Sequence, residues 1–141
     1  MGRVTQDVEV YFSYAYIPEA KIDRTGSAGT GLGQRVGLTP RHTGATWLSW
    51  QAMPKFRVAA GLRGASENRP LQGTSGAAST TAKAGGYTVV DAMAEYKFTP
   101  DTYAQLNVTN LANRTYGDQL YPGFSILGEG RSIKLTVGTR F

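Results

Sequence analysis

The sequence predicts an all-β protein, an antiparallel up-and-down meander of about six strands. Three observations support this fold class. Apolar and polar residues alternate with a period of two in one segment after another, which is the spacing at which side chains reach the two faces of a strand. Short turns that contain proline alternate with long, Gly-rich loops. The last alternating segment continues to residue 141, whereas the ends of soluble domains usually fray.

The alternating segments define the strands in chain order. The first strand, 8–16, places every second residue from Val8 to Tyr16 on an apolar face, opposite Glu9 and Ser13. The next segment, 45–52, is ambiguous, because its two tryptophans, Trp47 and Trp50, fall on opposite faces. The remaining alternating segments are residues 56–64, 88–98, 104–109 and 132–141.

The connections differ strongly in length. Residues 53–55 and 99–102 form short turns, whereas residues 23–43, 65–86 and 112–130 form long loops. Three such loops count against a compact soluble domain but are typical of outer-membrane barrels, whose periplasmic turns are short and whose extracellular loops are long. We therefore expect the apolar strand faces to meet lipid and the polar faces to meet a wet lumen.

The composition excludes several classes of function. Cysteine is absent and His42 is the single histidine, so disulfides, thiolate sites and most His-based metal clusters are ruled out. The net charge is +5, but Lys and Arg are scattered singly, so nucleic acid is not expected as a partner. No Ser/His/Asp or paired-carboxylate arrangement supports an enzyme. No segment approaches the roughly 18 consecutive apolar residues of a transmembrane helix.

The C-terminal strand ends in an aromatic residue that follows apolar or Thr residues at every second position. These residues are Ile133, Leu135, Val137, Thr139 and Phe141. The pattern resembles the C-terminal assembly signal of bacterial outer-membrane proteins. The resemblance implies that the barrel assembly machinery grips this strand and that outer-membrane lipid surrounds it. The alternative is an ordinary last strand of a soluble sandwich.

Three stretches, in this order, resemble the C-terminal end of TonB-dependent siderophore receptors. They are "LTPRHTGATWLSW" (38–50), "GGYTVVDAMAEYKFTPDTYAQLNVTNLANRTYGDQL" (85–120) and "YPGFSILGEGRSIKLTVGTRF" (121–141). The first resembles the Pro-Arg-His-Thr start of a descending strand. The second resembles a Gly-Tyr-x-x-x-Asp strand followed by a Leu-Asn-x-x-Asn-Leu-x-Asn-x-x-Tyr hairpin, and the third resembles the last loop and strand of the catecholate branch.

The resemblance implies that residues 1–141 are the C-terminal part of a 22-stranded barrel in the bacterial outer membrane. The plug domain, the signal peptide and the N-terminal segment that engages the TonB complex are absent from this sequence. The implied function is TonB-dependent uptake of a ferric siderophore, a catecholate by the likeness of the last loop. The siderophore is then the transported ligand, and neither a cofactor nor a metal site of the protein itself is implied.

Loop residues that suit an anionic, flat and aromatic ferric catecholate are the candidate ligand-binding residues, since arginine and aromatic side chains hold such molecules well. They are Arg41, His42, Tyr116, Gln119, Tyr121, Phe124 and Arg131, with Arg63 and Arg69 as further arginines. The alternative is that the aromatics form a girdle at the membrane interface and that Arg131 anchors the base of the last loop.

Two other functions fit parts of the pattern. A complete small outer-membrane barrel with a structural or adhesive role would need about two further strands. A soluble β-sandwich that binds carbohydrate would bury Ile133, Leu135 and Val137 in a core of its own.

Overall fold

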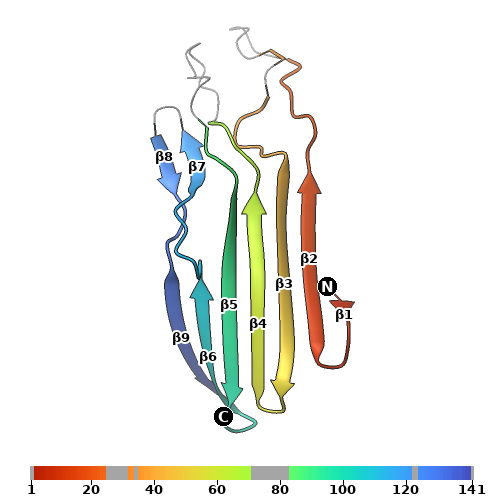
Figure 1. Cartoon of the computed structure of the whole chain (residues 1–141), viewed down its shortest axis with the longest axis vertical. Coiled ribbons are helices and arrows are strands. Elements are labelled where there is room, and N and C mark those ends of the chain that lie inside the picture. Colours follow the sequence, from red (N-terminus) through yellow and green to blue (C-terminus); the bar gives the residue numbers. More distant parts are fainter. Residues whose placement is uncertain (1, 25–31, 34, 71–82, 122–123, 141) are drawn as a thin grey trace.

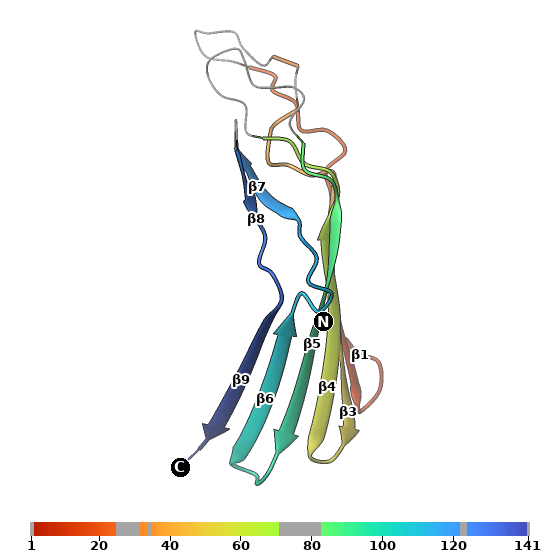
Figure 2. The ribbon, with the colours of Figure 1, turned by 60° about the vertical axis from the view of Figure 1, so that its left-hand side comes forward.

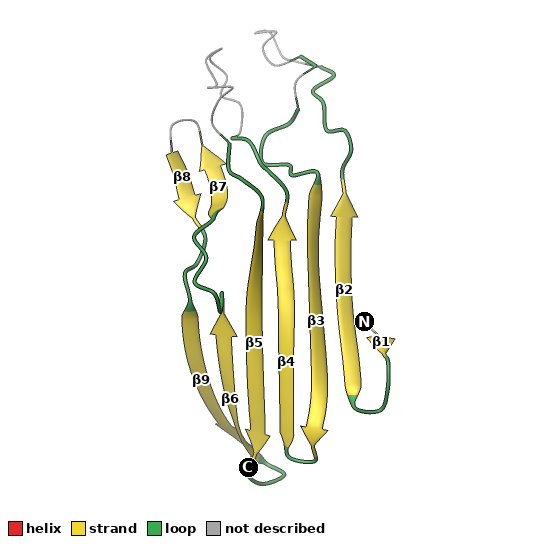
Figure 3. Cartoon of the chain, viewed as in Figure 1, coloured by secondary structure: helices red, strands yellow, loops and turns green. Residues whose placement is uncertain are grey.

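The computed structural model describes residues 2–24, 32–33, 35–70, 83–121 and 124–140 (Figure 1). Within these ranges the chain forms strands, turns and loops, and none of these residues is helical (Figure 3). The described segments include no helix long and apolar enough to cross a membrane. The strands are β1 (Gly2–Arg3), β2 (Val8–Tyr16), β3 (His42–Met53), β4 (Phe56–Ala65), β5 (Tyr87–Lys97), β6 (Thr102–Thr109), β7 (Gly117–Tyr121), β8 (Phe124–Leu127) and β9 (Ser132–Thr139).

Seven strands form one antiparallel sheet in the order β1-β2-β3-β4-β5-β6-β9, so the predicted up-and-down meander is confirmed. β7 and β8 form a separate two-stranded hairpin between β6 and β9 in the chain. The sequence predicted one long loop over 112–130, and the structure corrects this prediction. Strands of five and four residues are too short for a period of two to be recognised in the sequence.

The short connections gather at one end of the sheet, which we call the turn end (Figure 1). Residues 4–7, 54–55 and 98–101 lie there. Thr5 and Thr99 each stabilise their turn by accepting two backbone N–H groups at the side-chain hydroxyl. The opposite end of the sheet, the loop end, carries the long connections, as the sequence predicted.

The ambiguous segment 45–52 lies inside β3, a strand of 12 residues. Trp50 is 48% exposed on one face. Trp47 lies on the other face over Gly61 of β4, where a Cβ atom would overlap the indole ring. The two tryptophans lie on opposite faces because they are three residues apart in one strand, and Gly61 leaves room for the Trp47 ring.

The strand register joins the separate apolar faces into one surface, which we call the outer face. Leu106 of β6 pairs with Ala94 of β5 on one side and with Leu135 of β9 on the other. On the edge strand, Ile133, Leu135 and Val137 are 67%, 66% and 67% exposed. An apolar surface this exposed requires contact with another apolar medium.

The opposite side of the sheet, the inner face, carries polar side chains such as Arg57, Glu95 and Gln105. Figure 2 shows the sheet as a single layer that bends along its length, with the β7–β8 hairpin standing beside the loop end of β5. The described residues bury few side chains, and Val89 and Asn110 are the most deeply buried of them. The small core therefore lies where the last loop folds back on the sheet.

Candidate functional site

The tip of the β7–β8 hairpin brings three of the candidate residues together. The rings of Tyr121 and Phe124 stack at a centroid distance of 4.8 Å, and the Tyr121 hydroxyl donates to Gln119 Oε1 at 3.1 Å. Phe124 is 62% exposed. This aromatic tip presents a flat surface and an amide to solvent, an arrangement that can stack on a planar ligand.

Tyr116 lies at the base of the same hairpin and is buried. Its ring stacks on Tyr87 at 4.2 Å, and its hydroxyl accepts a hydrogen bond from Arg63 Nη1 at 3.1 Å. The ring also lies against Gly128, where a Cβ atom would overlap it. Tyr116 therefore fastens the hairpin to the sheet, whereas the sequence had presented it as a loop residue that could meet a ligand.

Arg63 belongs to a network that ties β4 and β5 to the last loop. Its Nε donates to Asp91 Oδ2 at 2.9 Å, and the other carboxylate oxygen of Asp91 accepts the backbone N–H of Asn110 at 2.8 Å. The Arg63 guanidinium also lies 5.9 Å from the centre of the Tyr116 ring. One arginine, placed on the inner face, thus joins the ion pair and the hairpin anchor.

Asn110 is a structural residue that the candidate list omitted. It is fully buried; its Nδ2 donates to the carbonyls of Arg114 and Glu129, and its Oδ1 accepts the Arg114 N–H. Asn110 and Asn113 have φ angles of 50° and 51°, a left-handed conformation that asparagine tolerates better than most residues. Two asparagines three residues apart, directly after a predicted strand, were the available signal.

Arg131 lies where the last loop returns to the sheet. Its backbone N–H donates to Asn113 Oδ1 at 2.9 Å. This bond holds the base of the loop through the main chain of Arg131 and leaves the guanidinium out of the anchoring contact.

Arg41 and His42 lie on a different part of the sheet from the aromatic tip, since β4 and β5 separate β3 from β6. His42 begins β3 and points to the outer face, where its ring stacks on Tyr16 at 4.8 Å and its Nδ1 is 2.8 Å from the Tyr14 hydroxyl. The structure therefore does not join these two candidates to Gln119, Tyr121 and Phe124.

Arg41 instead lines a hollow at the loop end that we call the cationic pocket, with a volume of about 460 Å³. Its charged lining is Arg35, Arg41, Arg69 and Glu67, and His42 stands at its edge. The Arg35 guanidinium donates to the carbonyls of three residues and so holds two loop segments together; these residues are Ile17, Pro18 and Thr39.

Glu67 is the acidic member of the cationic pocket. A hydrogen bond from the Lys83 ammonium, at 2.9 Å, holds the pKa of Glu67 below its ordinary value, and Arg69 adds a weaker attraction. The carboxylate is thus engaged by cations, and the pocket presents a net positive charge. Among the described residues, no group of three or more His, Cys, Asp or Glu could hold a metal ion.

The predicted assembly residues Ile133, Leu135, Val137 and Thr139 lie on the outer face of β9, and the Thr139 hydroxyl is 3.1 Å from that of Thr102. Phe141 lies outside the described residues. The role of this strand as an assembly signal stays a prediction.

Comparison with known proteins gives one consistent family. Residues 4–111 match the family described as TonB dependent receptor-like, beta-barrel. The probable TonB-dependent receptor BfrD of Bordetella pertussis is 33% identical over 142 residues, which cover 96% of this chain and 19% of BfrD. The crystal structure of the siderophore receptor PiuA from Acinetobacter baumannii has the same fold, with a TM-score of 0.83 and 23% identity over 98% of this chain and 20% of PiuA. The closed form of the ferric-catecholate import receptor Fiu from Escherichia coli K12 gives a TM-score of 0.78 and 29% identity over 99% of this chain and 20% of Fiu.

This chain therefore spans about a fifth of the length of these receptors. Outer-membrane barrels place an apolar face against lipid, which accounts for the exposure of Ile133, Leu135 and Val137 and excludes the soluble sandwich. The chain belongs to the β-barrel family of TonB-dependent receptors, and its strands lie in the bacterial outer membrane.

Proposed function

We propose that residues 1–141 are the C-terminal part of a 22-stranded barrel in a receptor that takes up ferric siderophores, with a catecholate as the iron-binding group. The siderophore is the transported ligand and not a resident cofactor, and the chain has no catalytic role. Energy reaches the barrel from the TonB complex, through parts of the receptor that this sequence does not contain.

The likeness to Fiu carries this proposal. Fiu is described as a ferric-catecholate import receptor, and 99% of this chain matches a fifth of Fiu at 29% identity. The open sheet also favours a large barrel over a complete small one, because β1 and β9 lie at opposite edges of the described sheet and do not pair with each other. A small closed barrel of about eight strands would need that pairing.

The aromatic tip is the proposed contact for the ligand. Tyr121 and Phe124 offer a stacking surface for a catechol ring, and Gln119 offers a hydrogen-bonding amide. Tyr116 and Arg131 position the loop that carries the tip. Arg41, at the cationic pocket, contributes positive charge that attracts an anionic siderophore to the loop end, and His42 stands at the edge of the same pocket.

The outer face is the surface that we expect the assembly partners to contact. Ile133, Leu135, Val137 and Thr139 form a stripe on β9 that the barrel assembly machinery can grip, and lipid covers the same stripe in the finished barrel.

An uptake assay tests the proposed function. The full-length product of the gene is expressed in an Escherichia coli strain that lacks its own catecholate receptors, with a ferric catecholate as the sole iron source. We expect the protein to restore growth and iron uptake. Failure of every ferric catecholate, together with uptake of another class of siderophore, would show that the proposed substrate is wrong.

Substitutions in the hairpin test the proposed contact. Phe124→Ala removes one stacking ring and should raise the siderophore concentration at half-maximal uptake about tenfold, a change typical of the loss of an aromatic contact residue. The control is Leu127→Ala, which removes an equally exposed apolar side chain from the other face of β8. Equal uptake by the two variants would show that the aromatic tip is not part of the binding site.

A further inference from the structure

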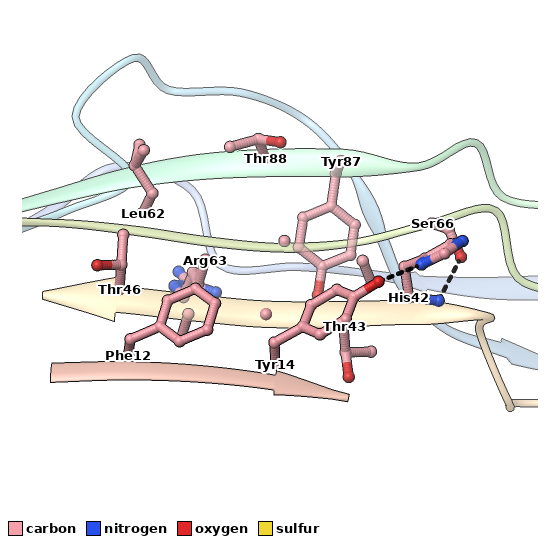
Figure 4. Close-up of a pocket in the computed structure, with 14 residues that line it drawn as sticks. Phe12, Tyr14, His42, Thr43, Thr46, Leu62, Arg63, Ser66, Tyr87 and Thr88 are labelled. Atoms are coloured by element: carbon pink, nitrogen blue, oxygen red, sulfur yellow. Dashed lines mark hydrogen bonds between the residues drawn. The ribbon is translucent and has the colours of Figure 1, made fainter. Parts of the chain in front are cut away.

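A hollow on the outer face, which we call the outer groove, lies across β2 to β5 near the loop end (Figure 4). Its floor is the point where Gly44 of β3 pairs directly with Gly64 of β4. Neither residue has a side chain, so the surface there lies lower than on the neighbouring strands. The groove has a volume of about 420 Å³.

Apolar and aromatic side chains form the walls of the outer groove. Phe12 and Tyr14 stand on the β2 side, and Leu62 and Thr88 stand on the β4 and β5 side (Figure 4). The register places all four on the outer face, because they pair with outer-face residues of the adjoining strands. The outer groove therefore opens toward the bilayer and not toward the transport path inside the barrel.

The loop end of the outer groove meets the cationic pocket. His42 and Ser66 line both hollows. The Tyr14 hydroxyl is hydrogen-bonded to His42 Nδ1 at 2.8 Å, and the backbone N–H of His42 donates to Ser66 Oγ at 3.1 Å, so this shared rim is held in place. An open apolar groove thus continues into a pocket rich in arginine.

A molecule that fits both hollows needs an apolar tail and an anionic head. We propose that the outer groove and the cationic pocket together bind one phosphorylated lipid of the surrounding bilayer. An acyl chain lies along Gly44 and Gly64, and the phosphate lies beside Arg41 and Arg69. Glu67, the acidic side chain of this pocket, lies 3.9 Å from Arg69 Nε, and the Lys83 ammonium that is hydrogen-bonded to it balances its charge. Arg35, Arg41 and Arg69 therefore leave the pocket with a net positive charge.

The charge and the position of the groove support this occupant. Basic residues at the edge of a bilayer attract anionic headgroups, and arginine forms strong charge-assisted hydrogen bonds with phosphate. The two proposals share the cationic pocket, but the outer groove lies on the outer face of the sheet, whereas the aromatic tip proposed to contact the siderophore lies on the β7–β8 hairpin. Lipid retention measured in the absence of siderophore therefore tests the lipid site independently of transport.

Native mass spectrometry of the full-length gene product tests the proposal. The protein is stripped of lipid in a neutral detergent and titrated with dimyristoyl phosphatidic acid, without siderophore. We expect this lipid to be retained about tenfold better than dimyristoylglycerol, which has the same chains and no phosphate, since two arginines face the headgroup. Equal retention of the two lipids would overturn the proposal, as would displacement of the lipid by an equal concentration of inorganic phosphate.

Two substitutions test the two halves of the site. Gly44→Leu fills the groove; a Cβ atom there lies 3.3 Å from the Ser13 carbonyl oxygen and 3.6 Å from Tyr14 Cδ2, so β2 must shift by a few tenths of an ångström to accept it. We expect phosphatidic acid to bind about tenfold more weakly, because the acyl chain loses its apolar contacts. Arg41→Gln should weaken the binding of phosphatidic acid about fivefold and leave the binding of dimyristoylglycerol unchanged.

Matched controls keep the result interpretable. Ala60→Leu places the same side chain on the outer face of β4 outside the groove, and Lys97→Gln removes a cation at the turn end. Both should bind the lipid as the unmodified protein does, and the migration of heated and unheated samples in gels checks folding. The proposal is wrong if Gly44→Leu binds phosphatidic acid as well as Ala60→Leu does, or if Arg41→Gln binds it as well as Lys97→Gln does. If Gly44→Leu fails to fold, the comparison of Arg41→Gln with Lys97→Gln decides the outcome.

Discussion

Asn110 shows how one side chain can hold a long loop. Its amide satisfies three backbone groups of residues 114 and 129, and its own N–H reaches the Asp91 carboxylate. Asn110 itself is fully buried, where an unpaired polar group is costly. The Leu-Asn-x-x-Asn motif seen in the sequence therefore has a structural purpose, which is to fix the start of the last loop.

Replacing Asn110 with Ala should destabilise the barrel strongly. The change leaves three backbone groups unpaired and places Ala at a φ angle of 50°, so we expect a loss of about 3 kcal/mol in the free energy of unfolding. Urea-induced unfolding of the full-length gene product in lipid vesicles measures the loss. The control is Asn107→Ala on β6, the strand that ends just before Asn110; among the described contacts, the Asn107 side chain accepts a hydrogen bond only from Gln105. Similar unfolding curves for both variants would contradict the role assigned to Asn110.

The connection between β4 and β5 is closed at its base by paired elements. Asn68 and Ala84 exchange two backbone hydrogen bonds of 3.0 Å, and the Lys83 ammonium reaches Glu67 beside them. Both side chains are exposed, so the ion pair adds little stability by itself. The effect of the ion pair is instead measurable as a lowered pKa of Glu67.

The Glu67 pair gives a pH dependence with a definite sign. Since the pKa of Glu67 is lowered in the folded protein, the pair favours the closed loop base above the ordinary glutamate pKa, and this contribution is lost as the pH falls through the lowered value. Lys83→Gln should raise the pKa of Glu67 toward its ordinary value. Carboxyl ¹³C shifts of labelled glutamate measure it, and Glu19, whose pKa is lowered by Lys21, is the internal control that should not change. A shift at both glutamates, or at neither, would contradict the pairing.

β9 shows why the two faces of a strand in this protein have different chemistry. Leu135 lies on the outer face opposite Leu106, whereas Thr136 lies on the inner face opposite Gln105. One step along the chain therefore changes the surroundings of a side chain from hydrocarbon to water.

An arginine on β9 should reveal this difference. Leu135→Arg places a charge in hydrocarbon and should cost about 2–4 kcal/mol of folding free energy, while Thr136→Arg on the wet inner face should cost far less. Folding of the full-length gene product into vesicles, followed by heat-modifiable gel migration, compares the two. Equal folding yields would mean that the outer face does not meet lipid.

The whole sheet is a single open layer. Its edge strands, β1 and β9, each lack a second neighbour within the described chain, and few side chains are buried. Unpaired strand edges invite pairing with other chains, and barrels avoid this by closing. The stability of these strands therefore depends on completion of the barrel.

Residues 1–141 expressed without further sequence should accordingly fail to form a monomeric barrel. We expect self-associated material in detergent, without the heat-dependent change in gel migration that closed barrels show, because about eight strands are the smallest number that closes. Size-exclusion chromatography with light scattering gives the oligomeric state. A monodisperse monomer with full β content would contradict this expectation.

Local sequence was enough to predict the long strands of the sheet and the contrast between short turns and long loops, but not the short strands β7 and β8. Period two depends only on neighbouring residues, and turn residues such as Thr5 and Thr99 act within their own turn. The grouping of Tyr121 with Phe124 could also be foreseen, since they lie close together in the chain. The buried position of Tyr116 could not, because its partner Arg63 lies 53 residues away.

Alternation along the chain established a sheet with one face for hydrocarbon and one for water, since most of the long strands carry that information in their own residues. The pairing of strands decided which distant residues meet: it set Asn110 and Tyr116 beneath the last loop, turned His42 to the outer face, and aligned Gly44 with Gly64 to form the outer groove. Register is a relation between strands, and no single strand encodes its partner.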